Sequence, residues 1–205
     1  MDYIRPQKLC RNFIRSKAEE FRQEFVNPPE IIPVPIIDIV ELKLQITPIP
    51  IPNMQKSIDV DAFLSNDLKS IYVDQDMYFD DRYLNRLRFT FAHEVGHFVL
   101  HAKEIQQCQF RNENDWLHFR EDMQEEDLFF FEQQAYEFAG RLLVPINALK
   151  RSIQNQKDKI EKYRSVIGDE NNDLLMGAIS RVICTEFKVS DGVILRRLQK
   201  EDINF

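Results

Sequence analysis

The sequence predicts an α+β fold, in which a small antiparallel sheet lies between helices and a helical tail closes the chain. Three short strand-like runs fall between residues 44 and 74, and apolar residues recur at helical spacing before and after them. The chain has 205 residues, 43% of them hydrophobic and 30% charged, which suits a globular protein with a sizeable core. We therefore expect one domain over residues 1–146 and a helical C-terminal extension over residues 147–205.

Two helices are predicted ahead of the sheet. Residues 7–26 carry apolar side chains at helical spacing, and Asn27-Pro28-Pro29 ends that pattern. Pro35 is expected to begin a short helix that continues through Leu42, because proline is tolerated in the first turn of a helix.

Three strands are expected to form the sheet. Their composition and alternation place them at residues 44–47, 58–64 and 70–74, and a turn at residues 65–67 joins the last two. We predict that they pair as an antiparallel sheet ahead of the next helix.

The rest of the chain is expected to be mainly helical. Its segments are a core helix at residues 86–100, a loop with short helical turns at 102–127, a helix at 128–143, a polar helix at 147–164, and tail helices at 176–188 and 191–200. The acid-rich segment at 102–127 contains scattered aromatic residues such as Trp116. Ser190 or Asp191 is expected to cap the last helix.

The stretch His93-Glu94-Val95-Gly96-His97 is the most informative part of the chain. Residues four apart share a helix face, so both imidazoles reach one ion, as in many zinc hydrolases. Glu94 stands beside them, where a carboxylate takes a proton from the attacking water and passes it to the leaving amine. So short a motif also occurs by chance. However, buried imidazoles on a core helix need polar partners, and a metal ion provides one.

A catalytic zinc site usually has three protein ligands, so one further residue is required. His101 lies a full turn past the ion on a straight helix, and we expect it to pack against the ligands or to support them. His118, in the acid-rich segment, is expected to be exposed.

Two carboxylates on the helix at residues 128–143 differ in helical angle. Glu132 shares its face with Ala135 and Ala139 and is expected to face the core, whereas Glu137 is expected to face water. The small residues would also let this helix approach the His-bearing helix closely. The alternative is that the alanines are ordinary core packing and that Glu132 is an exposed acid at the helix start.

Together the two helices resemble the ImmA/IrrE-type metallopeptidase family. The residues that carry the resemblance, beside the motif itself, are Arg88-Phe89-Thr90, Leu100-His101, and the run from Glu132 through Val144-Pro145. The similarity extends more loosely over most of the chain. The long acidic segment at residues 102–127 departs from the family pattern.

The resemblance implies a minimal zincin-like metallopeptidase core of the gluzincin type. In it, His93, His97 and Glu132 hold Zn²⁺ and Glu94 is the catalytic base. Family members are associated with cleavage of a repressor protein, so the implied function is a zinc-dependent endopeptidase with a protein substrate such as a transcriptional repressor. The strand at residues 70–74, if it is the sheet edge beside the cleft, would align an extended peptide by backbone hydrogen bonds. No residue can be assigned to oxyanion stabilisation.

Two other functions remain open. In the first, the protein is a non-catalytic module with a structural or vestigial zinc site that docks a repressor or another partner. In the second, the tail helices at residues 179–187 and 191–200 form a helix-turn-helix that contacts DNA. Its modest basicity comes from Arg181, Lys188, Arg196, Arg197 and Lys200. The formal net charge of −7 argues against autonomous DNA binding and against binding to anionic membranes.

Cysteine usage and hydropathy indicate where the protein works. The three cysteines, Cys10, Cys108 and Cys184, are widely separated and predict neither a disulfide framework nor a thiolate zinc site. The first residues lack the apolar run of a signal peptide, and no stretch is apolar enough to span a membrane. We therefore expect a soluble cytoplasmic protein.

Overall fold

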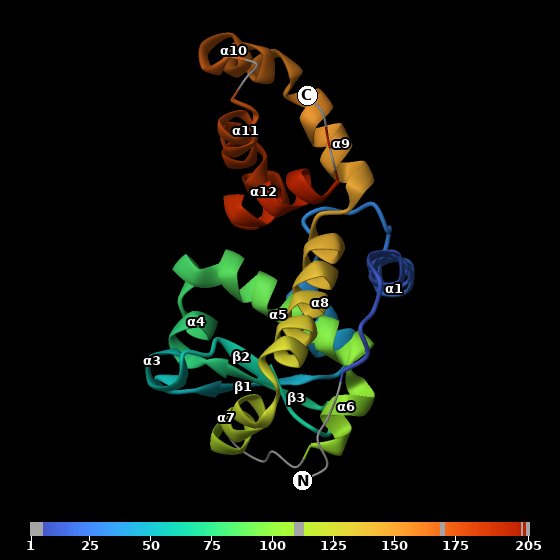
Figure 1. Ribbon diagram of the computed structural model, residues 1–205, viewed down its shortest axis with the longest axis vertical. Helices are drawn as coiled ribbons and strands as arrows, with labels where there is room; N and C mark the ends of the chain where they lie inside the picture. The colour runs from blue at the N-terminus through green and yellow to red at the C-terminus, as the bar shows by residue number, and fades with distance from the viewer. Residues whose placement is uncertain (1–5, 109–112, 169–170, 202, 204–205) are drawn as a thin grey trace.

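The computed structural model of the protein describes residues 6–108, 113–168, 171–201 and 203 (Figure 1). In chain order its elements are α1 (Arg11–Phe25), α2 (Ile36–Asp38), the π-helix η1 (Ile39–Lys43), β1 (Thr47–Ile51), α3 (Met54–Ile58), β2 (Ala62–Leu64), β3 (Ser70–Asp74), α4 (Gln75–Phe79), the 3₁₀-helix η2 (Asp81–Tyr83), α5 (Leu84–Leu100), α6 (Ala102–Gln107), α7 (Glu113–Asp122), α8 (Glu125–Leu143), α9 (Ile146–Asn155), α10 (Lys157–Ile167), α11 (Asn172–Phe187) and α12 (Asp191–Lys200). The sheet lies in the lower half of Figure 1, α9 to α12 gather at the top, and α8 runs up towards them. The α+β class is confirmed.

The sheet has the strand order β1-β3-β2 and is mixed, which corrects the expected antiparallel sheet. β2 pairs antiparallel with β3, as predicted for two strands joined by a turn, whereas β1 pairs parallel with β3. The strand expected at residues 44–47 begins only at Thr47 and contains Pro48 and Pro50. Proline donates no backbone hydrogen bond, and β1 tolerates it because this strand lies at a sheet edge. α3 takes up the start of the second expected strand.

Helices occupy most of the described part of the segment at residues 102–127, where a loop with short helical turns was expected. α7 packs on the sheet through Trp116, whose ring stacks on that of Phe63 in β2 at 5.2 Å between centroids. Such tertiary packing stabilises a helix whose own sequence pattern is weak.

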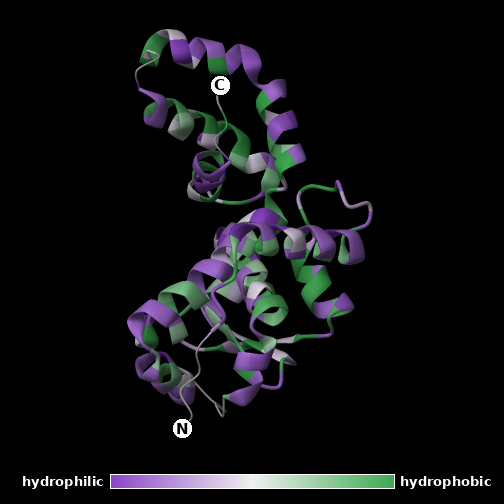
Figure 2. Ribbon diagram, turned by 45° about the vertical axis from the view of Figure 1, so that its right-hand side comes forward, coloured by the Kyte–Doolittle hydropathy of each residue, from purple (hydrophilic) through white to green (hydrophobic). Residues whose placement is uncertain are grey.

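The C-terminal helices also differ from the expected pattern in one place. The polar helix expected at residues 147–164 is two helices, α9 and α10, with a break at Gln156. α11 and α12 lie where two tail helices are predicted, and Ser190 occupies the N-cap position of α12 without a side-chain cap hydrogen bond. Hydrophilic and hydrophobic bands alternate along α9 in Figure 2, as in a helix with one buried side. Within the described ranges, no helix combines the length and the apolar character needed to cross a bilayer.

α5 lies at the centre of the lower half, packed against β2 on one side and α8 on another. Its apolar residues Phe91, Ala92 and Val95 are fully buried. A Cβ added at Gly96 would lie 3.0 Å from both the Cα and the carbonyl oxygen of Ala135, so α5 and α8 touch backbone to backbone at this point. This close approach, which the small residues of α8 predict, brings Glu132 within reach of α5.

Candidate metal centre

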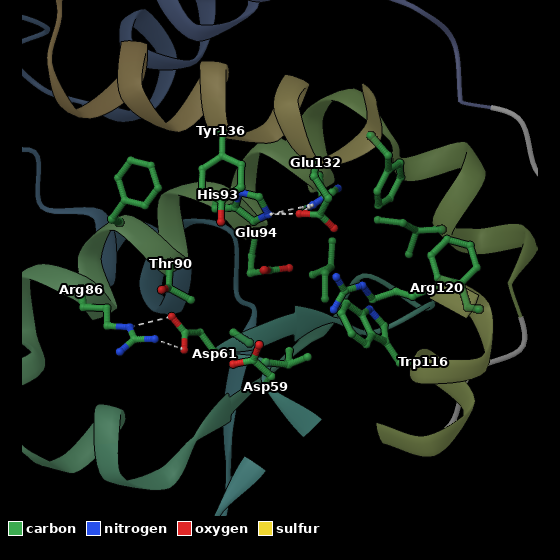
Figure 3. Close-up of a pocket in the computed structure, with 18 residues that line it drawn as sticks. Asp59, Asp61, Arg86, Thr90, His93, Glu94, Trp116, Arg120, Glu132 and Tyr136 are labelled. Atoms are coloured by element: carbon green, nitrogen blue, oxygen red, sulfur yellow. Dashed lines mark hydrogen bonds and ion pairs between the residues drawn. The ribbon is translucent and has the colours of Figure 1, made fainter. Parts of the chain in front are cut away.

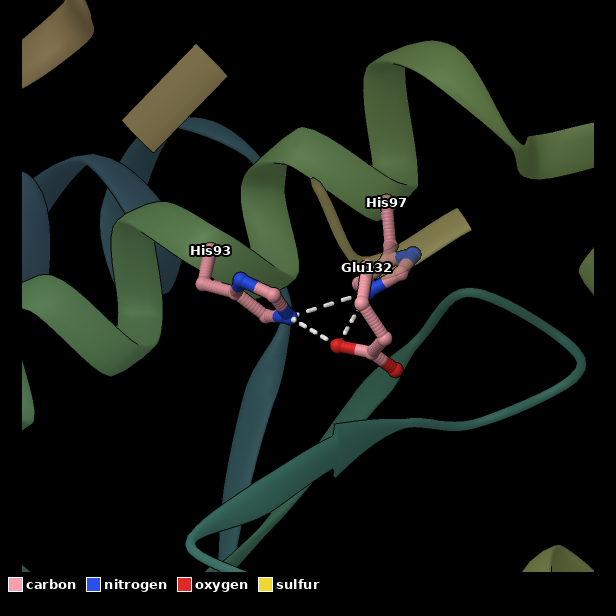
Figure 4. A group of neighbouring side chains, drawn as sticks. All are labelled: His93, His97 and Glu132. Atoms are coloured by element: carbon pink, nitrogen blue, oxygen red, sulfur yellow. Dashed lines mark hydrogen bonds and ion pairs between the residues drawn. The ribbon is translucent and has the colours of Figure 1, made fainter. Parts of the chain in front are cut away.

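Three side chains with metal-binding atoms converge where α5 and α8 cross (Figure 4). His93 and His97 lie one turn apart on α5, and Glu132 reaches them from α8. The two imidazole Nε2 atoms are 3.0 Å apart. Glu132 Oε2 lies 3.1 Å from His93 Nε2 and 4.0 Å from His97 Nε2. The structure therefore brings together the three residues predicted as ligands, with all donor atoms within 4.8 Å of one another.

These distances fit a single small cation. With bonds of about 2.0 to 2.1 Å, the donor atoms of a tetrahedral zinc site lie roughly 3.3 Å apart, which is inside the observed range. The imidazole nitrogens of His93 and His97 face each other in a largely buried setting, where two lone pairs repel unless a proton or a cation lies between them. Two imidazoles and one carboxylate are a donor set that suits zinc and leaves one position open.

Glu94 follows His93 on α5 and is only 4% exposed. Burial, supported by the charge of Glu132, raises the pKa of Glu94 to about 7, while the charge of His93 and a hydrogen bond with the Leu64 backbone act in the opposite direction. A carboxyl group with a pKa near neutrality both accepts and returns a proton readily. Glu94 therefore lines the same pocket as the candidate ligands and has a proton affinity suited to acid/base chemistry.

The ionisation of the candidate ligands reflects their mutual contact. Burial favours the neutral form of His93, but the hydrogen bond and the charge of Glu132 outweigh it and raise the pKa of His93. Burial also disfavours the charged form of Glu132, but the bond with His93 and the charges of His93 and Arg120 lower its pKa. The pKa of His97 lies well below its ordinary value, because His97 is buried and stands next to two other imidazoles. His97 is therefore neutral, as a metal ligand must be.

His101 supports His97 from behind, which agrees with the supporting position expected for it. Its Nδ1 lies 3.0 Å from His97 Nδ1, and its Nε2 lies 3.5 Å from Oε1 of Gln134. The amide of Gln134 donates to the Gln7 carbonyl, so its oxygen faces His101 and accepts from the imidazole. His101 then carries its proton on Nε2 and accepts from His97 Nδ1. This arrangement leaves the lone pair of His97 Nε2 directed at the metal position.

The convergent side chains line one pocket of about 430 Å³ (Figure 3). Its walls come from α5, α7, α8 and the β2 region. On one side, the guanidinium of Arg86 binds Asp61 through hydrogen bonds of 2.6 and 2.7 Å. Trp116 and Arg120 of α7 form the opposite side in Figure 3. The pocket thus contains the three candidate ligands, the buried carboxyl group of Glu94 and two arginines, of which Arg86 binds Asp61 and Arg120 lies over Trp116.

β2 is the strand that borders the pocket, which corrects the expectation for residues 70–74. That segment is β3, the central strand of the sheet. The hydrogen bond from Ser65 N to the Ser70 carbonyl (2.8 Å) fixes the pairing of β2 with β3, and residues alternate in direction along an antiparallel pair. The backbone groups of Ala62 and Leu64 therefore point away from β3, and both residues line the pocket.

Glu137 is buried, not exposed as the sequence predicted. Its carboxylate, with 6% side-chain exposure, binds Arg141 of α8 at 2.5 Å and also binds Lys200 of α12. α8 is covered on more than one face, because α12 packs on the side that carries Glu137 as well as α5 on the side that carries Glu132. The packing of α12 on α8 also buries Arg197, which is 3% exposed and donates to the Val144 carbonyl at 3.2 Å. Two basic residues of the expected helix-turn-helix are therefore engaged within the protein, Lys200 with Glu137 of α8 and Arg197 with the residue that caps α8.

Other residues of the pocket have no role in the sequence prediction. The Tyr136 ring lies 4.5 Å from that of His93, between centroids. Trp116 and Arg120 enter from α7, and their spacing of four on one helix was the available signal that they share a face. His118 lies midway between Trp116 and Arg120 in the sequence but on another side of the helix, and it is exposed as expected.

Comparison with known families agrees with this geometry. The profile of the IrrE N-terminal-like domain, Peptidase M78, matches residues 80–199, a range that contains α5 and α8 in full and most of α12. No curated protein and no solved structure shows significant similarity to the chain. Because the matched range covers more than half of the sequence and includes the His93, His97 and Glu132 cluster, the chain belongs to the IrrE N-terminal-like family of metallopeptidases.

Proposed function

We propose that the protein is a zinc-dependent endopeptidase that cleaves a protein substrate such as a transcriptional repressor. The observation that carries this proposal is the convergence of His93, His97 and Glu132 in a pocket that also holds the buried carboxyl group of Glu94. Membership of a metallopeptidase family supports hydrolysis of a peptide bond as the reaction. The choice of a repressor rests on the family resemblance.

Each residue has a separate task in the proposed reaction. His93, His97 and Glu132 hold the ion, and His101 keeps His97 in the tautomer that binds it. When bound, zinc polarises the scissile carbonyl and lowers the pKa of water. Glu94 accepts the proton of the attacking water and returns it to the leaving amine.

The substrate backbone is proposed to bind along β2. Ala62 directs its backbone N–H and carbonyl away from β3, and Leu64 directs its carbonyl the same way, while the Leu64 N–H binds Glu94. Both residues line the pocket, so an extended peptide can add to this edge through the Ala62 groups and the Leu64 carbonyl. Backbone hydrogen bonds of this kind hold a peptide in place whatever its side chains are. A substrate segment must therefore be extended and unpaired when it enters the pocket.

Replacement of Glu94 by Gln tests the proposal. The Glu94→Gln protein should bind zinc as wild type does, while cleavage of a peptide library, followed by mass spectrometry of new termini, falls by roughly 10²- to 10⁴-fold. The matched control is Glu125→Gln, an exposed acid in the first turn of α8, which should cleave normally.

Capture from the native host with Glu94→Gln as a trap would identify the protein substrate. Undiminished cleavage by the zinc-loaded Glu94→Gln protein would contradict the assigned base. Full binding of a captured repressor without any cleavage by the wild type would favour the docking module instead.

A further inference from the structure

Arg120 occupies an unusual place in the pocket wall. It comes from α7, in the acid-rich segment that departs from the family pattern, and its guanidinium lies over the ring of Trp116 at 4.9 Å from the centroid. Figure 3 shows the guanidinium pointing into the pocket, towards the carboxylates of Glu94 and Glu132. Stacking on an indole ring restricts the orientation of the guanidinium plane.

The two arginines of the pocket differ in their partners. Arg86 binds both oxygens of Asp61, so its charge and its donors are satisfied within the protein. Within the described part of the chain, Arg120 makes no ion pair, and its buried Nε atom has no hydrogen-bond partner. The Nε atom itself is covered by protein, so an acceptor from outside the chain would meet the terminal nitrogens of the guanidinium, which face the pocket in Figure 3.

The charges around the pocket leave Arg120 available for such an acceptor. With a divalent ion bound, the carboxylates of Glu94 and Glu132 balance the charge at the centre, and Asp61 balances Arg86. Asp59 is exposed and lies in Figure 3 on the side of Asp61, across the pocket from Arg120. The planar fork of an arginine matches the two oxygens of a carboxylate and forms charge-assisted hydrogen bonds with it.

We propose that Arg120, held in place by Trp116, binds the carboxylate of an acidic side chain in the substrate, close to the scissile bond. This inference rests on the proposed function, because it assigns specificity to the same pocket. A peptide bound along β2 passes between the two sides of the pocket and presents its side chains to one or the other. The substrate class is therefore an extended segment with Asp or Glu on the Arg120 side.

Four peptide hydroxamates test this assignment on the zinc-loaded protein. In them Glu or Gln stands first or second from the metal-binding group, and calorimetry gives the dissociation constant of each for wild type and variants. We expect wild type to bind a Glu compound roughly tenfold or more tightly than its Gln partner at one of the two positions. Arg120→Gln should abolish the difference, and Arg120→Lys should keep part of it, because lysine retains the charge without the fork.

Two controls show that the variants remain intact. Arg82→Gln removes an exposed arginine that pairs with Asp80 outside the pocket, and it should keep the full preference for Glu. Zinc content and the melting temperature of the Arg120 variants should match those of wild type.

The outcomes separate this inference from the proposed function. If wild type binds the hydroxamates without preference, or if Arg120→Gln keeps the preference, carboxylate recognition by Arg120 is wrong while the metal centre stands. Equal weakening of Glu and Gln compounds by Arg120→Gln also overturns the inference, since Arg120 would then act on the metal-binding group. If the zinc-loaded wild type binds none of the compounds, the proposed function and the inference fail together.

Discussion

Helix α8 carries Glu132 towards α5 and the pocket, and Glu137 towards α12. These two sides of α8 differ in how many of their polar groups have a partner. On the α12 side, Glu137 binds Arg141 and Lys200, and Glu201 binds Arg141 at 3.0 Å and Arg197 at 2.7 Å. Every one of these charges has an opposite partner.

The pocket side of α8 is arranged differently. Glu132 binds His93, but the buried Nδ1 atom of His93 and the buried Nε atom of Arg120 have no hydrogen-bond partner among the described residues. Glu94 nearby is buried, with its pKa raised to about 7. Buried polar groups are normally paired, and groups with perturbed pKa values gather at functional sites. The difference indicates that the α12 side stabilises the fold and that the pocket side is kept for ligands.

Removal of the Glu137 carboxylate should have the largest effect on stability. In Glu137→Gln, the buried guanidinium of Arg141 loses a charged partner, and the free energy of unfolding should fall by about 3 kcal/mol or more. Urea denaturation of the metal-free protein measures this change. Zinc affinity should stay as in wild type.

Glu132→Gln is the matched control on the same helix. Its carboxylate is 25% exposed, so the metal-free protein should lose less than about 1 kcal/mol, while zinc affinity should fall sharply because a ligand is removed. A large loss of stability in Glu132→Gln with unchanged zinc binding would reverse the two assignments.

The pH dependence of stability should separate the two sides next. Burial raises the pKa of Glu94 from 4.5 to about 7, so the folded state binds more protons between these values and its stability falls as pH rises through this window. For Glu137, burial acts in the same direction, but Lys200 and Arg141 outweigh it and lower the pKa, so that carboxylate stabilises the fold above its ordinary pKa and the benefit is lost as pH falls.

The two carboxylates are distinguished by unfolding with urea at pH 5 and pH 8 in the presence of a chelator. Relative to wild type, Glu94→Gln should gain stability between these values, approaching about 3 kcal/mol when the whole window is crossed. Glu137→Gln should lose most at the higher pH. A Glu94→Gln difference that does not change with pH would show that Glu94 titrates normally.

The two sides of α8 also show which features could be predicted from the sequence. His93, Glu94 and His97 follow from local helical spacing. The helical angle of Glu132 turns it towards the core, and the family resemblance makes it the third ligand. Glu137 is misplaced by the same argument, because a helical angle gives direction without giving the number of neighbours, and α12 joins from far along the chain.

The parallel strand β1 and the helix α7 were also not predicted, because both depend on contacts with residues far away in the sequence. Pro48 and Pro50 make the sequence of β1 unlike that of a typical strand, and its parallel pairing depends on β3, more than twenty residues later. Trp116 and Arg120 reach the pocket only because α7 packs on β2, a contact that no local pattern in an acid-rich segment encodes.

The smallest expected effect concerns the hydrogen bond between His97 and His101, which lies on the opposite side of the His97 ring from the candidate metal position. In His101→Phe the aromatic packing against Phe131, now at 4.4 Å between ring centroids, is kept, but the acceptor for His97 Nδ1 is lost. Zinc affinity should fall by roughly 10- to 100-fold, because an unsupported imidazole samples the wrong tautomer and orientation. Competition with a chromophoric chelator measures the affinity, and His118→Phe, which changes an exposed imidazole, should leave it unaltered. Equal zinc affinities for wild type and His101→Phe would mean that packing on α5 alone holds His97 in place. The hydrogen bonds from His97 through His101 to Gln134 would then stabilise the fold and not the metal site.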